Sequence, residues 1–478
     1  MAESDIERLR DAIDHAWEEA RNFGLDPFPT HFELVPASIM YEFASYSLPG
    51  RFSHWTHGKA YHRQKMQYDF GLSKIYEMVV NTNPSYAFLM EMNDLLQNTF
   101  VAAHVFGHTD FFKNNAYFQH TSRRMIDKVS IHAERIAQYE FDHGKAEVER
   151  FLDAVLSIQE HVDYNLLIRE EKPRDPDEKI PKSPGPYDDL WGIDERAKRA
   201  EEERDRRPGR PPKFPEKPQK DILLFLSQHA PHLEPWQRDI IEIVRTEMLY
   251  FVPQMQTKVM NEGWASIWHS RIMRRLGETG VISDSETIEF AQLHSSVLSP
   301  SRTSLNPYYL GFKMFEDVER RWNNPTKEEQ ERLGRKPGSG LQKIFEIREM
   351  ENDVSFLRNY LTEDLVKELD LYLYKKEGDE WVIVEKNWEK VRDGIVASLT
   401  NFGSPYLVVD NGDYHGNREL YIVHVFEGQE LDLNYAEKTL QHVYLLWGRP
   451  VHLETVYDGK KILLSYDGER NSKTTLEK

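Results

Sequence analysis

Two histidines four residues apart are the first pair in this sequence whose spacing could bind a metal ion. His104 and His108 lie in the segment AHVFGHTDFF, which we expect to be helical, and a polar helix face is one alternative explanation for them. Positions i and i+4 share one face of a helix, so both imidazoles can reach a single ion. The spacing alone suits hydrogen-bonded core histidines equally well, and a third ligand is needed to favour a metal site.

A glutamate in a later helical segment supplies such a ligand. Glu262 stands in the run NEGWASIWH, where small residues follow it and allow close packing against a second helix. Metal-dependent peptidases of the gluzincin kind combine two histidines of one helix with a glutamate of a later one. His104, His108 and Glu262 would form a two-histidine, one-carboxylate set with an open position. The predicted cofactor is one divalent metal ion, Zn²⁺ first, with Fe²⁺ or Mn²⁺ as alternatives.

The sequence lacks the catalytic base that a zinc peptidase would need. In the zinc-peptidase motif H-E-x-x-H, a glutamate directly after the first histidine activates water. Here that position is Val105. Another carboxylate would have to replace it, and Asp110 is the candidate catalytic residue. The sequence leaves open whether the protein is an enzyme. If it is one, we expect a metal-dependent, hydrolase-like protein that lacks the usual motif glutamate.

A second Glu/His pattern has the spacing of di-metal carboxylate proteins. Glu140, His143 and Glu147 follow one another in a long helical segment, and Glu-x-x-His is the motif of such sites. A di-metal site needs two copies of that motif, and we find one on a convincing helix. We therefore interpret these side chains as solvated charges on an exposed helix face.

A cluster of cations interleaved with aromatic residues marks a candidate binding wall. Arg51, His54 and Lys59, with His57 and His62, lie in the segment GRFSHWTHGKAYHRQK. Cations beside aromatic rings are suited to an anionic or carbohydrate-like ligand. Pairing with the chain's abundant acidic residues is the alternative. We predict substrate binding by Arg51, His54 and Lys59.

These residues need a scaffold, and the hydrophobic periodicity predicts a helical one. No strand-like alternation of any length precedes residue 370. Residues 25–70, rich in aromatic residues, His, Pro and Gly, are expected to form short helices joined by ordered, buried connections. Longer helices are predicted at residues 3–23, 84–106, 121–166, 221–228, 235–278, 284–296, 307–321 and 340–351.

The pattern changes twice along the chain. Residues 173–218 hold ten of the 24 prolines and dense mixed charge, which indicates a solvated linker or insertion. From residue 371 onward, six segments rich in β-branched and aromatic residues predict strands, interrupted by helices near 387–402 and 433–447. Their order is β-β-α-β-β-α-β-β, which suits a small α+β domain.

The predicted fold class is therefore a mainly α N-terminal body plus a small α+β C-terminal domain. The body would be zincin- or gluzincin-like if the metal set forms. The expected domains are residues 1–172 and 219–366 for the two parts of the helical body, 173–218 for the linker and 367–478 for the α+β domain.

Composition excludes several classes of function. The chain has 61 basic and 80 acidic residues and a net charge of −19, which opposes non-specific binding to nucleic acid or anionic membranes. It has no cysteine, which excludes disulfides, thiolate zinc sites and a cysteine nucleophile. Nucleotide-binding glycine motifs and the G-x-S-x-G elbow are missing. With no signal-peptide core and no apolar run of about 18 residues, we expect a cytoplasmic protein without membrane insertion or a nucleic-acid partner.

Several long segments resemble the SpoVR family, named for stage V sporulation protein R. They include GRFSHWTHGKAYHRQK, AHVFGHTDFFKNN, PQMQTKVMNEGWASIWH, LNPYYLGFKMFEDVERRW and FEIREMENDVSFLRNYLT. The resemblance implies a role in spore cortex peptidoglycan formation, in the mother cell where the organism forms spores. It also implies protein partners, a PrkA-type serine kinase and a von Willebrand A-type protein. Two of the matching segments contain His104, His108 and Glu262, which favours the metal-site interpretation.

Two functions therefore remain open. One is a metal-dependent, hydrolase-like protein with a site at His104, His108 and Glu262, lined by residues 25–70. The other is a non-catalytic scaffold or regulator that acts through protein partners such as the kinase. A polar cavity lined by His and Glu would favour the first, and an exposed apolar patch would favour the second.

Overall fold

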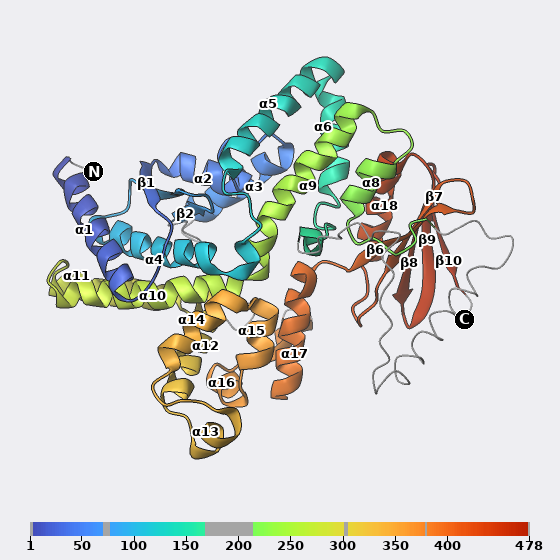
Figure 1. Ribbon diagram of the computed structural model, residues 1–478. Helices are drawn as coiled ribbons and strands as arrows, with labels where there is room; N and C mark the ends of the chain where they lie inside the picture. Colours follow the sequence, from blue (N-terminus) through green and yellow to red (C-terminus); the bar gives the residue numbers. More distant parts are fainter. Residues whose placement is uncertain (1–2, 70–76, 168–213, 301–304, 378–379, 477–478) are drawn as a thin grey trace, which may run out of the picture. The chain divides into compact units, whose positions relative to one another are not determined.

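The computed structural model describes residues 3–69, 77–167, 214–300, 305–377 and 380–476 (Figure 1). The chain divides into two units. The first comprises Met1–Glu149 and Thr246–Ser404, and the second comprises Arg150–Arg245 and Pro405–Lys478. Most of the Pro-rich segment 173–218, predicted as a linker, lies outside the described residues. No helix in the described ranges is long and apolar enough to cross a membrane.

Helices build most of the first unit, as the periodicity predicts. Their shared core gathers apolar side chains from both ends of the unit's sequence. The helices are α1 (Glu3–Asn22), α2 (Ala37–Tyr46), α3 (Trp55–Asp69), α4 (Leu95–Asn114), α5 (Met125–His143), α10 (Lys258–Glu278), α11 (Asp284–Val297), α12 (Pro307–Asn323), α13 (Lys327–Leu333), α14 (Gly340–Met350), α15 (Asp353–Tyr360), α16 (Glu363–Glu368) and α17 (Trp388–Leu399), with short 3-10 turns at Ala116–Phe118 and Thr400–Gly403.

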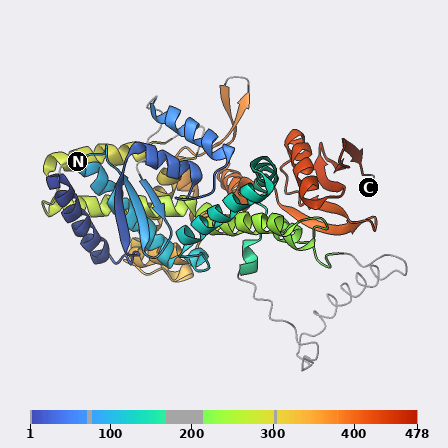
Figure 2. The same ribbon diagram turned by 90° about the horizontal axis from the view of Figure 1, so that it is seen from above.

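A three-stranded sheet in this unit corrects the expectation that no strand precedes residue 370. Strands β1 (Thr30–Val35), β2 (Glu77–Val80) and β3 (Ser85–Met90) have the order β1-β3-β2, with β1 parallel and β2 antiparallel to β3 (Figure 2). The central strand is buried on both faces, since Ala87 and Leu89 join the main core while Phe88 and Met90 join a second core. Such a strand is a continuous apolar run, which period alone cannot distinguish from a buried helix.

Two predicted helices are broken in the structure. The helix expected over 121–166 ends at His143, where Gly144 adopts a φ of +92° and α6 (Lys145–Leu156) begins. Glu140, His143 and Glu147 consequently do not share one continuous helix, and their side chains are partly or fully exposed. The helix expected over 235–278 divides at Thr257 into α9 (Pro235–Gln256) and α10.

The strands and helices predicted after residue 371 are present in the predicted order, and the structure adds a seventh strand, β10, that was not predicted. Strands β4 (Leu373–Glu377) and β5 (Glu380–Glu385) form a two-stranded ribbon that precedes α17 in the first unit. The second unit holds a five-stranded sheet of order β10-β9-β8-β7-β6, in which β7 and β8 are parallel and the other pairs antiparallel. Its elements are η2 (Tyr164–Leu167), α8 (Ile222–His229), β6 (Leu407–Tyr414), β7 (Glu419–His424), α18 (Leu433–Trp447), β8 (Val451–Tyr457), β9 (Lys460–Tyr466) and β10 (Asn471–Thr475), with parts of α6 and α9.

A buried histidine makes the second unit sensitive to acid. His161 follows α6, and burial, with a smaller effect of the Lys220 charge, lowers its pKa from 6.5 to about 4. The unfolded chain takes up this proton near pH 6.5, whereas the folded chain takes it up only near pH 4. The stability that neutral His161 contributes is therefore fully present above pH 6.5 and is lost progressively as the pH falls from 6.5 to about 4.

That loss amounts to about 3 kcal/mol for a shift of this size. We expect the stability difference between the wild type and a His161→Leu variant to change by this amount between pH 7 and pH 4. Urea denaturation followed by tryptophan fluorescence at several pH values measures it. A difference that stays constant with pH would contradict the lowered pKa.

Candidate metal centre

Helix α4 carries both histidines of the candidate site through the core of the first unit. Asp94 caps the helix by accepting from the Gln97 N–H at 2.7 Å, while the Gln97 side chain accepts from the Asp94 N–H. This reciprocal capping box satisfies two of the free N–H groups at the helix start. The helix is buried from Asn98 to Phe112, which explains why its residues are apolar all round rather than on one face.

Small residues bring α10 unusually close to its two neighbours. A Cβ atom added at Gly107 of α4 would lie 2.6 Å from the Ala265 Cα of α10. On the other side, a Cβ at Gly263 would lie 2.3 Å from the carbonyl carbon of Gly311 in α12. Real Cβ contacts are not this short, so only glycine allows these helices to pack at this distance. Glu262, next to Gly263, is thereby held between α4 and α12.

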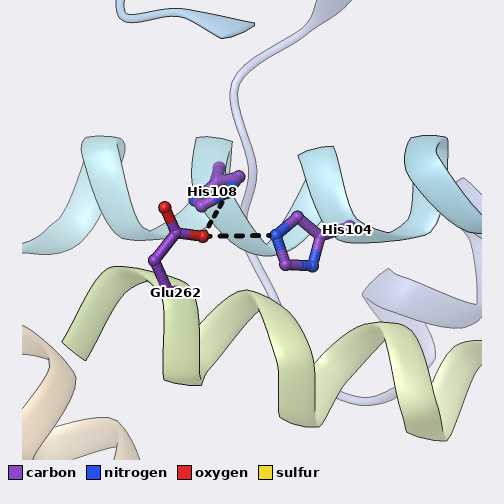
Figure 3. A group of neighbouring side chains, drawn as sticks. All are labelled: His104, His108 and Glu262. Carbon is purple, nitrogen blue, oxygen red and sulfur yellow. Dashed lines mark ion pairs between the residues drawn. The ribbon is translucent and has the colours of Figure 1, made fainter. Parts of the chain in front are cut away.

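The structure brings His104, His108 and Glu262 together (Figure 3). The Nε2 atoms of both histidines lie 3.5 Å from the same Glu262 oxygen, Oε2, and the side chains are between 4 and 17% exposed. Ligands about 2.0–2.1 Å from a tetrahedral Zn²⁺ stand roughly 3.3 Å from one another, so the observed spacing fits a shared ion.

Hydrogen bonds to the far side of each imidazole fix the ring orientations. His108 Nδ1 lies 2.9 Å from the Asn261 side-chain oxygen, which can accept only if Nδ1 carries the proton. That tautomer leaves the Nε2 lone pair directed at Glu262. Histidines that bind metals usually donate their other N–H in this way.

His104 begins a chain of three imidazoles. Its Nδ1 lies 2.7 Å from His269 Nδ1, and His269 Nε2 lies 2.7 Å from Nδ1 of His294, which is half-buried on α11. Burial, and then the neighbouring histidines, lower the pKa of His269 well below its usual value. Burial and the Arg274 charge lower the pKa of His294 to about 4. The two rings are thus neutral at pH 7 and link the buried centre to a more exposed position.

Glu262 is ionised in spite of its burial. Burial alone raises the pKa of this carboxyl, but His108, His104 and a hydrogen bond with Tyr308 outweigh that effect and lower it. Tyr308 lies in the first turn of α12, which Asn306 caps, and its ring stacks on His104 with centroids 5.9 Å apart. An anionic carboxylate beside two imidazoles is a donor set suited to a divalent cation.

Sequence reasoning gave no role to three residues of the site, His269, His294 and Tyr308. His269 ends the run NEGWASIWH and lies seven residues after Glu262, so both residues share a face of α10, and this spacing could have indicated its role. His294 and Tyr308 come from α11 and α12, and no spacing in the sequence relates them to the pair on α4.

Asp110, the predicted base, is fully buried and engaged in structural hydrogen bonds. Its Oδ1 accepts from the Asp26 N–H at 2.8 Å and its Oδ2 from Trp264 Nε1 at 2.8 Å, with Arg348 3.7 Å from Oδ2. Burial raises its pKa, although Arg348 and the hydrogen bonds oppose the shift. These bonds tie the loop after α1 and the helix α10 to α4.

We therefore expect an Asp110→Ala variant to lose stability and keep its metal. The buried Trp264 Nε1–H would lose its acceptor, at about 1–3 kcal/mol, and the partly buried Asp26 N–H would lose its acceptor at a smaller cost. The free energy of unfolding from urea denaturation and the metal content of the same preparation test this. Unchanged stability together with lost turnover would instead support a catalytic role.

The residues of the predicted binding wall differ in burial and pairing. Arg51 donates to Glu247 at 2.7 Å, and this buried carboxylate also lies 3.0 Å from His132 Nδ1. His54 and His57 are buried, with His54 Nδ1 2.7 Å from the Thr56 hydroxyl. Lys59 and His62 are exposed on α3. Arg51 is thus paired with an acidic residue, and substrate binding by Arg51, His54 and Lys59 stays a prediction.

Comparisons with known proteins agree with the resemblance seen in the sequence. A family described as "SpoVR like protein" matches residues 3–404, and one described as "SpoVR-like C-terminal domain" matches residues 405–458. The uncharacterized protein YcgB of Escherichia coli (strain K12) is 30% identical over 467 residues, covering 91% of this chain and 89% of the relative. No solved structure matches the chain. The boundary between the two matches coincides with the break between the structural units at Ser404, and the chain belongs to the SpoVR family.

Proposed function

We propose that this SpoVR protein binds one Zn²⁺ ion at His104, His108 and Glu262 and is a metal-dependent hydrolase of peptidoglycan precursors. The observation that carries the proposal is the spacing of the three ligand atoms. Two imidazole nitrogens stand 3.5 Å from one carboxylate oxygen, which is close to the spacing between the ligands of a tetrahedral Zn²⁺ ion.

Three protein ligands leave a fourth position for water, and bound Zn²⁺ lowers the pKa of that water to about 7. Within the chain, Asn261 orients His108 and His269 orients His104. Tyr308 holds the carboxylate of Glu262 by a hydrogen bond. The imidazole chain to His294 offers a hydrogen-bonded route for a proton between the centre and a half-buried side chain.

Family membership supports the choice of process. The resemblance to the SpoVR family implies a role in spore cortex formation. Peptidoglycan precursors contain amide bonds, which a metal-activated water can attack. We propose that the protein acts in the cytoplasm, and in spore-forming organisms in the cytoplasm of the mother cell. Peptidoglycan is assembled outside the membrane, and a cytoplasmic enzyme can affect it by acting on a precursor.

The proposal is tested by incubating Zn²⁺-loaded protein with peptidoglycan precursors and muropeptides and measuring newly released amino groups. Release that requires Zn²⁺ and vanishes in the His104→Ala, His108→Ala variant is the expected result. Full zinc occupancy without any release would reject hydrolysis and leave the non-catalytic alternative.

An exposed apolar strand favours that alternative, a scaffold or regulator. Four consecutive residues of β5, from Trp381 to Val384, are between 36 and 54% exposed, on a two-stranded ribbon. Consecutive exposed apolar residues are typical of a surface that binds another protein. In this case the PrkA-type serine kinase and the von Willebrand A-type protein are the proposed partners. Loss of kinase binding in a Trp381→Ser, Ile383→Ser variant tests the alternative.

A further inference from the structure

The five-stranded sheet of the second unit has one apolar and one polar face. Along β7 and β8 every second side chain is buried, including Leu420, Ile422, Val451 and Leu453. The alternate side chains lie on the other face, where Tyr421 pairs with His452 in the parallel register of the two strands. Two histidines, two tyrosines and two glutamates gather on this partly exposed face and at the β6–β7 turn: His415, His452, Tyr414, Tyr421, Glu419 and Glu454.

Both histidines converge on a single glutamate oxygen. His415 Nδ1 and His452 Nε2 are each hydrogen-bonded to Glu419 Oε2 at 2.9 Å, and the three groups lie within 4.8 Å of one another. His415 comes from the β6–β7 turn, Glu419 begins β7, and His452 is the second residue of β8. The glutamate and His452 are only 14 and 12% exposed, whereas His415 is 59% exposed. One rim of the group is thus open to solvent.

Surrounding contacts fix the orientation of all three groups. The Ser465 hydroxyl on β9 lies 2.7 Å from His452 Nδ1, and it can either donate to that nitrogen or accept from it. Asn417 donates to the second oxygen of Glu419 at 2.8 Å. The Tyr414 ring packs on His415 and His452, with centroids 3.9 and 5.2 Å away. These contacts leave one nitrogen of each imidazole and one carboxylate oxygen facing one another.

We propose that His415, Glu419 and His452 bind a divalent transition-metal ion, Zn²⁺ first, that links the β6–β7 turn to β8. Two imidazoles and a carboxylate form a donor set for Zn²⁺ or Cu²⁺, and Asn417 and Ser465 supply the outer hydrogen bonds that such ligands usually make. An ion would replace these hydrogen bonds and widen the 2.9 Å separations to roughly 3.3 Å, which requires small shifts of both the exposed His415 side chain and the Glu419 carboxylate. Its solvent-exposed rim leaves a coordination position for water or an external ligand.

This site belongs to the second unit and does not depend on the centre formed by His104, His108 and Glu262. Because His415 is exposed, we expect the ion here to exchange readily and to be lost during purification. It should return when Zn²⁺ is added at micromolar concentration.

Zinc titration of chelator-treated full-length protein, followed by equilibrium dialysis and elemental analysis, tests the inference. The wild type should take up about one more equivalent than either a His415→Ala or a Glu419→Gln variant. His232→Ala, at an exposed histidine of the same unit, is the matched control and should bind as the wild type does. The difference should persist in the His104→Ala, His108→Ala background, which separates this site from the proposed centre.

A spectroscopic measurement identifies the ligands. Cu²⁺ bound at this site should give an electron paramagnetic resonance spectrum with coupling to two nitrogens, reduced to one in His415→Ala. Zinc uptake that is equal in wild type, His415→Ala and Glu419→Gln would overturn the proposal. So would a Cu²⁺ signal that is unchanged by both substitutions. Unchanged urea midpoints of the variants verify that they are folded.

Discussion

Protein purified without chelator is expected to carry about one equivalent of Zn²⁺ per chain, and the His104→Ala, His108→Ala variant is expected to carry none. The two imidazoles supply two of three ligands, and one carboxylate alone does not hold Zn²⁺ in competition with water. Elemental mass spectrometry of untagged protein measures the content. His120→Ala, at an exposed histidine of the same unit, is the matched control and should retain the ion.

Substitutions around the ligands should give graded effects. Asn261→Leu removes the acceptor that orients His108, and such outer partners typically change metal affinity by about 10–100-fold. Zinc should also stabilise the fold, by about 2.7 kcal/mol when its free concentration is 100 times the dissociation constant. A metal-free wild type that takes up no Zn²⁺ except through His415, Glu419 and His452 would reject the centre between α4 and α10.

Gly311→Ala is expected to be the most damaging single substitution of a small residue in the first unit. The added Cβ would lie 2.1 Å from the Val259 carbonyl oxygen and 2.8 Å from the Gly263 Cα, both backbone atoms that cannot rotate away. Alanine favours a helix over glycine by about 1 kcal/mol, but overpacking costs about 1–3 kcal/mol and sometimes more. The clash therefore outweighs the helix propensity, and we expect a net loss of about 2 kcal/mol or more.

Metal binding should fall together with stability in this variant. Separating α12 from α10 moves Gly263 and with it Glu262, so the third ligand leaves its place beside the histidines. Urea denaturation and zinc affinity of the same protein measure both effects. Gly58→Ala is the control, because this exposed glycine of α3 has no atom within 4 Å of an added Cβ. It should be neutral or stabilising by about 0.5–1 kcal/mol. Equal midpoints for both variants would contradict the close packing of α10 and α12.

Sequence reasoning grouped His104, His108 and Glu262, which the structure brings together, because helical spacing is a local property. His104 and His108 are four residues apart, and any helix through them places both on one face. The small residues after Glu262 indicated close packing, which Gly263 and Gly311 confirm. The strand-helix order after residue 371 was equally readable, since β7 and β8 alternate between buried and partly exposed side chains.

The spacing of apolar residues along the sequence cannot identify a strand that is buried on both faces. Strand β3 has apolar side chains on both faces, so it lacked the alternation that marks a half-buried strand, and it was mistaken for the start of a helix. Gly144 ended a helix that the periodicity continued, because a single residue with positive φ changes the direction of the chain without altering the pattern around it.

The sequence by itself determined the helical body, the α+β pattern of the C-terminal segment, the family and the residue types of the candidate centre. Only the tertiary structure decided which side chains meet. Tyr308 stacks on His104 because α12 packs against α10, and His294 reaches His269 because α11 packs against α10. His452 meets Glu419 because β7 and β8 are parallel neighbours. Such contacts join residues tens of positions apart, and close packing in three dimensions, rather than spacing along the chain, brings them together.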